Sequence, residues 1–281
     1  MIHRSILFLA ILFSGITFGA EKKPAAPPPN SIDAGLAAWN AVREAIGVPP
    51  VKRDPKLEEM AMKHIDYMKA TKTLTHHQDK EHPKYTEDGD KSGRGSCLGQ
   101  GLNRPVDAIM NQLNCFLHRI PLIQPDLENV SFCLDGGFAA FDYRNGARRE
   151  YEWKGPIAYP ADKATDFAPS WSGREGPCPI PGGPPRGAVG QPVTLTFAPN
   201  DKVTDGKITL TEGKNAVDGW VSSPDKPAVE MFSDNLQTIC FIAKQPLKPK
   251  TAYTVKVTAT VNEKPFEKTW TFTTSSGGRT R

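Results

Sequence analysis

Two histidines at the ends of expected helices are the residues of this chain best suited to carry chemistry. His76 follows an apolar-striped segment that ends near Lys72, and His118 lies in the run 116–123 that closes a later segment. A Gly-rich stretch, residues 92–101, lies between them. Imidazole is a common metal ligand and exchanges protons near neutral pH. We therefore expect both imidazoles to face one cleft, as metal ligands or as an acid–base pair.

The cysteines indicate an oxidising compartment, although their odd number prevents complete internal pairing. We expect two disulfides among the first four cysteines, with Cys97 bonded to Cys115 or Cys133, and a buried free thiol at Cys240. A Cys97–His118 nucleophile pair is the alternative, because a thiolate beside imidazolium is activated. No pair has the CxxC spacing of a zinc ribbon. The five cysteines are Cys97, Cys115, Cys133, Cys178 and Cys240.

The N-terminus has the pattern of a secretory signal peptide. A basic start precedes an apolar run, and small residues up to Ala20 suit a cleavage site. The run is shorter than the ~20 residues that a membrane-spanning helix needs. No cysteine follows it to carry a lipid anchor, and no other stretch is apolar enough to span. We expect a secreted, periplasmic or cell-envelope protein with no transmembrane segment after signal removal.

The length and the net charge limit the number of domains and the kind of partner. The 281 residues, with ordinary apolar and charged fractions, suffice for one large domain or two of usual size. The net charge of +4 is modest, and basic and acidic residues alternate without forming a stripe. Nucleic acid is therefore not an expected partner.

Apolar residues at helical spacing predict three helices before residue 125. The first begins at Ser31, a good helix cap, and ends near Gly47. The second follows Asp54, and its apolar stripe includes His64, which we expect to be a hydrogen-bonded core residue. The third runs from Pro105 to Pro121 and places His118 in its last turn. Residues 77–101 are charged and Gly-rich, which predicts a long irregular loop at the site.

Beyond residue 125 the pattern changes to the alternation of β-strands. Residues 129–134, 138–143 and 149–153 are predicted strands, so the first part of the chain is α+β. The Pro/Gly-dense segment 160–190 indicates an extended linker at a domain boundary. Thr-rich alternation then predicts a β-sandwich. Its strands are 193–197, 207–211, 237–242, 253–261 and 268–274.

With these elements placed, residues 31–159 resemble the CAP superfamily in its bacterial form, the cysteine-rich secretory, antigen 5 and pathogenesis-related 1 (SCP-like) proteins. The last part resembles the Ig-like modules of bacterial exported proteins. The resemblance implies an α+β fold, a CAP-type α-β-α sandwich followed by an all-β Ig-like sandwich. Its motifs are Asn40-x-x-Arg43, Leu57-x-x-x-Ala61-x-x-His64, Thr75-His76, the loop Tyr85-Thr86-Glu87-Asp88-Gly89, and His118-Arg119-Ile120-Pro121. The expected organisation is signal peptide 1–20, Pro/Ala-rich tether 21–30, CAP domain 31–159, linker 160–190, Ig-like domain 191–275 and flexible tail 276–281.

The resemblance also implies a cleft in which two histidines and two acidic residues hold a divalent metal such as zinc. His76 and His118 correspond to the histidines, whereas Ser96 and Cys97 stand where the family has Glu and Asn. No Asp or Glu lies between residues 108 and 115 to supply the second acid. A tight metal site would therefore need a further ligand. The candidates are His77, Asp79, His82 and Cys97.

These observations favour an exported, non-enzymatic binding module for a small ligand, a lipid or an envelope component, with the Ig-like domain as a spacer. The expected cleft residues are His76, His118, Ser96, Cys97 and Arg119. Arg119 would bind an anionic ligand, unless it caps helix carbonyls or pairs with Asp126. Two alternatives remain: a protease-like hydrolase that depends on a metal or cysteine, and a structural or adhesive envelope protein with a vestigial cleft.

Overall fold

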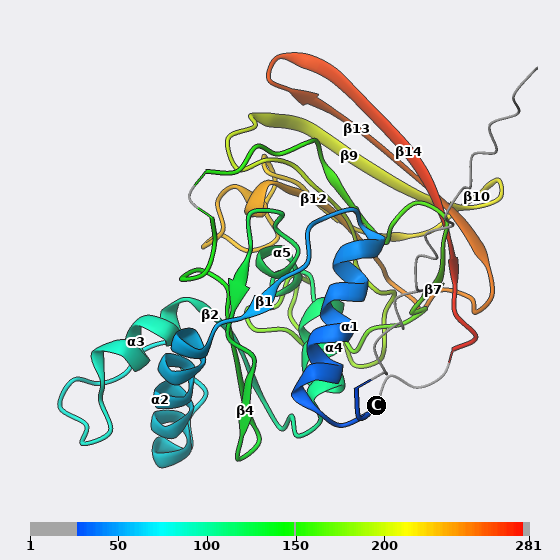
Figure 1. Cartoon of the computed structure of the whole chain (residues 1–281). Coiled ribbons are helices and arrows are strands. Elements are labelled where there is room, and N and C mark those ends of the chain that lie inside the picture. Colours follow the sequence, from blue (N-terminus) through cyan, green and yellow to red (C-terminus); the bar gives the residue numbers. More distant parts are fainter. Residues whose placement is uncertain (1–26, 149, 278–281) are drawn as a thin grey trace, which may run out of the picture.

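The structure is a computed structural model that describes residues 27–148 and 150–277 (Figure 1). The expected signal peptide 1–20, most of the tether 21–30 and the last residues of the tail lie outside the described residues. Within the part that is described, no helix combines the length and the apolar composition that crossing a bilayer requires.

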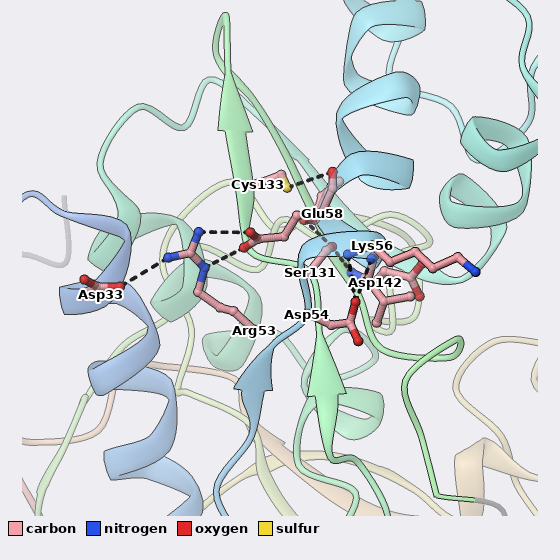
Figure 2. A network of polar contacts seen from close by, with 10 residues as sticks. Asp33, Arg53, Asp54, Lys56, Glu58, Ser131, Cys133 and Asp142 are labelled. Atoms are coloured by element: carbon pink, nitrogen blue, oxygen red, sulfur yellow. Dashed lines mark hydrogen bonds and ion pairs between the residues drawn. The ribbon is translucent and has the colours of Figure 1, made fainter.

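The first two helices form as their sequences predict. Helix α1 (Ile32–Ala45) is capped by Ser31, whose side chain accepts a hydrogen bond from the Ala34 amide. Helix α2 (Pro55–Thr71) is capped in the same way by Asp54. Arg53, in the short strand β1 (Lys52–Arg53), links the two helices because it forms ion pairs with Asp33 and Glu58 (Figure 2).

The expected third helix is interrupted, so the prediction of one helix from Pro105 to Pro121 is wrong. Helix α4 (Pro105–Asn114) ends where Cys115 takes an extended conformation, and His118 directly precedes the short helix α5 (Arg119–Leu122). A continuous helix would bond the amides of Phe116 and His118 to carbonyls four residues earlier. Both amides instead donate to the side chain of Glu175.

The expected irregular loop 77–101 also contains regular structure, which corrects that prediction. Helix α3 (Glu87–Arg94) is capped by Thr86, and strand β2 (Ser96–Gln100) follows it. Gly93 lies against α2, where an added Cβ would come within 2.6 Å of both ring nitrogens of His64. Gly93, which suggested a loop, instead allows α3 to pack closely against α2.

Around one small sheet the helices form an α-β-α arrangement. Its antiparallel strands have the order β2-β5-β4, with β5 at Phe138–Asp142 and β4 at Cys133–Asp135. Helix α2 packs with Leu98, Phe138 and Ala140, while Trp39 of α1 and residues of α4 pack with Ala139 and Phe141. Strand β1 pairs in parallel with β3 (Asn129–Val130). The strand expected at 149–153 does not form at residues 150–153.

Two larger sheets make up the second part of the chain. The first has the order β10-β9-β13-β14-β7 and the second the order β11-β12-β8-β6. Buried residues of both sheets form one apolar core, so the sheets pack face to face as a sandwich. Figure 1 shows the long strands β13 and β14 at the opposite end of the molecule from α2 and α3. The bounds are β6 (Ile157–Tyr159), β7 (Ala164–Phe167), β8 (Val193–Thr196), β9 (Val203–Glu212), β10 (Asn215–Ala216), β11 (Gly219–Ser222), the 3-10 helix η1 (Asn235–Gln237), β12 (Thr238–Ala243), β13 (Ala252–Val261) and β14 (Lys264–Thr274).

The Pro/Gly-rich segment 160–190 is packed between these two parts. Strand β7 lies within it and pairs with β14. Trp171 and Val189 exchange two backbone hydrogen bonds of 2.8 and 2.9 Å, and both are buried in the same core cluster as α1 and α4. The mixed α+β fold followed by a β-rich region is confirmed, and the segment between them is part of the core.

Candidate functional site

The side chain of Glu175 lies against His118, although the two residues are 57 positions apart. Its Oε1 is 2.7 Å from His118 Nδ1 and accepts the His118 amide at 2.8 Å, while Oε2 accepts the Phe116 amide at 2.9 Å. The Glu175 side chain is fully buried, whereas the His118 side chain is 20% exposed. The acidic partner that is absent from residues 108–115 thus comes from the Pro/Gly-rich segment.

This contact defines which nitrogen of the His118 ring carries a proton. An ionised carboxylate can only accept hydrogen bonds, so Nδ1 carries the proton that is donated to Glu175. In a neutral ring with this tautomer, the opposite nitrogen, Nε2, carries the lone pair. Carboxylate–histidine pairs of this kind orient the ring for ligation or proton transfer.

The buried thiol of Cys115 lies beside this pair. Its Sγ, a carboxylate oxygen of Glu175 and a ring nitrogen of His118 all lie within 4.8 Å of one another. Burial raises the pKa of the Cys115 thiol, and the negative charge of Glu175 raises it further. The thiol therefore stays protonated at neutral pH unless a cation replaces its proton.

Cys97 is not paired with the His118 imidazole, so the alternative of a Cys97–His118 nucleophile pair is wrong as well. Its Sγ lies 3.4 Å from the backbone oxygen of His118, to which the thiol donates. Burial raises the pKa of the Cys97 thiol well above its usual range, with a smaller contribution from Glu175. A buried protonated thiol on a carbonyl is not an activated nucleophile.

All five cysteines are free, so the expected disulfides are wrong. Sheet geometry explains the absence of a Cys97–Cys133 bond. Cys97 is paired with Phe141, and Cys133 with Ala140, the adjacent residue of β5. Adjacent residues of a strand point to opposite faces, so the two thiols lie on opposite sides of the sheet. Cys240 is a buried thiol in β12, as predicted.

The residues around His76 make other contacts. His76 is exposed, and its Nδ1 lies 2.9 Å from the Gly93 oxygen of α3. The Ser96 hydroxyl is buried and donates to the Ser92 oxygen at 2.7 Å. His64 is a buried core residue, as predicted. Its Nε2 lies 2.7 Å from the Thr75 oxygen, and burial lowers its pKa.

The four-ligand metal set implied by the CAP resemblance does not fit these residues. Ser96 offers a hydroxyl that is already hydrogen-bonded, and no carboxylate is grouped with His76. Among the described residues, the grouping of three ligands within reach of one ion contains His118 without His76. The further candidates His77, Asp79 and His82 lie outside that grouping.

Arg119 is fully buried between the two parts of the chain. Its Nη2 donates to the Pro192 oxygen at 2.9 Å, and its guanidinium lies 4.0 Å from the ring centre of Tyr159 in β6. Burial lowers the pKa of the Arg119 guanidinium. These contacts attach the helical part to the β-sandwich.

An open depression of about 630 Å³ lies beside Glu175. Arg174 and Arg186, two of its lining residues, are exposed, and the ion pairs found among the described residues include neither guanidinium. Sequence reasoning missed this surface because it lies in the expected linker. One signal was present, since Glu175 is the only acidic residue between Asp166 and Asp201. The lining consists of Arg174, Glu175, Gly176, Pro184, Pro185 and Arg186.

Comparisons with known proteins bear on residues 36–133. No curated protein matches the chain. Among solved structures, it is similar to an extracellular protein containing an SCP domain from Bacillus anthracis strain Ames, with 17% identity and a TM-score of 0.35. That match covers 42% of this chain and 40% of that protein, so this chain spans less than half of the other's length. Residues 36–133 match the Cysteine-rich secretory protein family, CAP, and this part of the chain is a CAP domain.

Proposed function

We propose that the chain is an exported, non-enzymatic binding module whose ligand carries an anionic group. The observation that carries this proposal is the pair of exposed arginines, Arg174 and Arg186, around one depression. Guanidinium groups bind carboxylate and phosphate through paired hydrogen bonds. Pro184 and Pro185 supply apolar surface at the same place. The combination suits a lipid headgroup or another small anionic envelope component.

The chemistry of the neighbouring residues favours binding over hydrolysis. Glu175 has no exposed side-chain surface, and its carboxylate accepts hydrogen bonds from Phe116 and His118. It therefore orients the histidine and does not itself face a water or substrate. The thiols of Cys97 and Cys115 are held in the protonated form by burial. No activated nucleophile accompanies the His118 ring in the described site.

In this proposal the β-sandwich does more than act as a spacer. The segment between β7 and β8 supplies Glu175 and both arginines, and Trp171 and Val189 hold that segment in the common core. The binding surface is thus built from the CAP domain and from chain that belongs to the sandwich connection.

Isothermal titration with soluble short-chain lipids tests the proposal. We expect dioctanoyl phosphatidylglycerol to bind, and dioctanoyl phosphatidylcholine to bind far more weakly. Inorganic phosphate separates recognition of the headgroup from recognition of phosphate alone. Each of Arg174→Ala and Arg186→Ala should weaken binding about tenfold, since each removes a charged hydrogen-bond donor.

Arg104→Ala is the matched control, because Arg104 is an exposed arginine paired with Asp107 and does not line the depression. Equal affinity of the double variant R174A/R186A and the unmodified chain would contradict the proposed site. Absence of binding to every anionic probe would favour the structural or adhesive alternative.

A further inference from the structure

We propose that Cys115, His118 and Glu175 form a zinc site. This ligand set differs from the one implied by the CAP resemblance, because it omits His76 and takes its carboxylate from outside the matched residues 36–133. The inference does not depend on the proposed anionic ligand.

Geometry is the first support. The three ligand atoms come from separate places in the chain, namely the end of α4, the start of α5 and the connection between β7 and β8. All three lie within 4.8 Å of one another. Ligand atoms around one tetrahedral zinc are roughly 3.4 to 3.8 Å apart, given bonds of about 2.1 to 2.3 Å. Small side-chain shifts therefore suffice to close the set around an ion.

The ligand types select the metal. A thiolate, an imidazole nitrogen and a carboxylate oxygen are the groups that bind Zn²⁺, whereas Mg²⁺ and Ca²⁺ prefer oxygen alone. Three protein ligands leave one position for water or another group. His118 is the partly exposed member of the set, so solvent can reach the site from its side.

Backbone amides hold the carboxylate ready for an ion. Glu175 Oε2 is fixed by the Phe116 amide at 2.9 Å, and Oε1 is fixed by the His118 amide at 2.8 Å. Such outer contacts position metal ligands and raise affinity. The 2.7 Å separation of Oε1 and His118 Nδ1 contains one proton, which an ion bound to both atoms would replace.

The proton balance follows from this arrangement. Binding at Nδ1 of a neutral ring moves the ring proton to Nε2 through solvent, with no net release. The Cys115 thiol loses its proton to solvent when the Zn–S bond forms. About one proton should therefore be released for each zinc bound, and affinity should increase with pH.

Cobalt titration of the full chain, reduced and stripped with a chelator, provides the test. A thiolate ligand gives Co²⁺ an intense near-ultraviolet charge-transfer band, and added Zn²⁺ should abolish it. We expect Cys115→Ser to remove the band. Glu175→Gln should weaken cobalt and zinc binding by about 100-fold, while it keeps a side-chain oxygen for one of the two backbone amides.

His76→Ala and Cys178→Ser are the matched controls, and both should keep the band and the affinity. Thermal melts show whether each variant is folded. The inference is overturned if the folded chain binds no cobalt, if the band persists in Cys115→Ser, or if His76→Ala removes binding. It is also overturned if thiol counting on the native exported protein finds Cys115 in a disulfide. Lipid titration of R174A/R186A uses neither metal nor Cys115, so failure of one proposal leaves the other open to its own test.

Discussion

The carboxylate of Glu175 lies 2.7 Å from the Nδ1 atom of His118. It also accepts hydrogen bonds from the backbone amides of Phe116 and His118, which ends helix α4. One side chain from the connection between the sheets thereby sets both the backbone path and the ring orientation of a CAP-domain histidine. The proposed zinc site includes this contact, whereas the proposed anion site rests on the exposed arginines Arg174 and Arg186 beside it.

Removal of the Glu175 carboxylate should destabilise the fold. In Glu175→Ala the part-buried amides of Phe116 and His118 lose their acceptor, at a cost of about 1–3 kcal/mol each. Glu175→Gln keeps an acceptor oxygen, so its loss should be smaller. Urea unfolding measures both. Glu230→Ala, at an exposed position, serves as the control, and an equal effect of all three changes would contradict the capping role.

Gly93→Ala should destabilise the chain, although alanine is the better helix former. The added Cβ would come within 2.6 Å of the His64 ring nitrogens, and His64 is fully buried. Overpacking costs about 1–3 kcal/mol, which exceeds the helix-propensity gain of about 1 kcal/mol. Chemical denaturation gives the sign. Gly187→Ala should be nearly neutral, because no atom lies within 4 Å of the added Cβ.

Stability should fall as the pH decreases through the range in which histidine titrates. Burial lowers the pKa of His64 in the folded state, so the unfolded chain binds the proton first. The contribution of His64 is therefore present above the unfolded value of about 6.5 and is lost as the pH falls toward the folded value. Unfolding free energies at about pH 7.5 and about pH 5.5 should differ less in His64→Gln than in the unmodified chain. Lys84→Gln, at an exposed site, serves as the matched control.

Thiol labelling should proceed in two phases. Cys178 is half-buried, whereas the other four cysteines are buried, so Cys178 should react first with dithiobis-nitrobenzoate. Cys178→Ser should remove the fast phase. Rapid reaction of Cys133 would contradict the contact of its Sγ with the Glu58 oxygen at 3.5 Å beneath α2.

The sequence predicted the parts of the fold whose signals are local. Caps at Ser31 and Asp54 and apolar stripes located α1 and α2, and alternation located the main strands of the sandwich. The break after Asn114 could not be predicted in this way, because its cause is Glu175. Helix α3 was not predicted because its glycines indicate a loop. They are needed for close packing against His64, which the sequence does not reveal.

The candidate site, too, was predicted only in part from the sequence. His118 was identified from its motif, while its acidic partner stood in a segment whose composition indicated a linker. The cysteines suggested disulfides through their number, but strand register places Cys97 and Cys133 on opposite faces of the sheet. Both errors come from contacts that join distant segments of the chain.

Residues of the CAP domain and of the β-sandwich lie in one apolar core, so the two parts cannot be separated without exposing it. A recombination event that transferred residues 36–133 alone would carry His118 and Cys115 but leave Glu175 behind. It would also deprive the buried guanidinium of Arg119 of the Pro192 oxygen and the Tyr159 ring. Transfer of that segment alone would therefore remove the His118–Glu175 contact, which needs both parts of the chain.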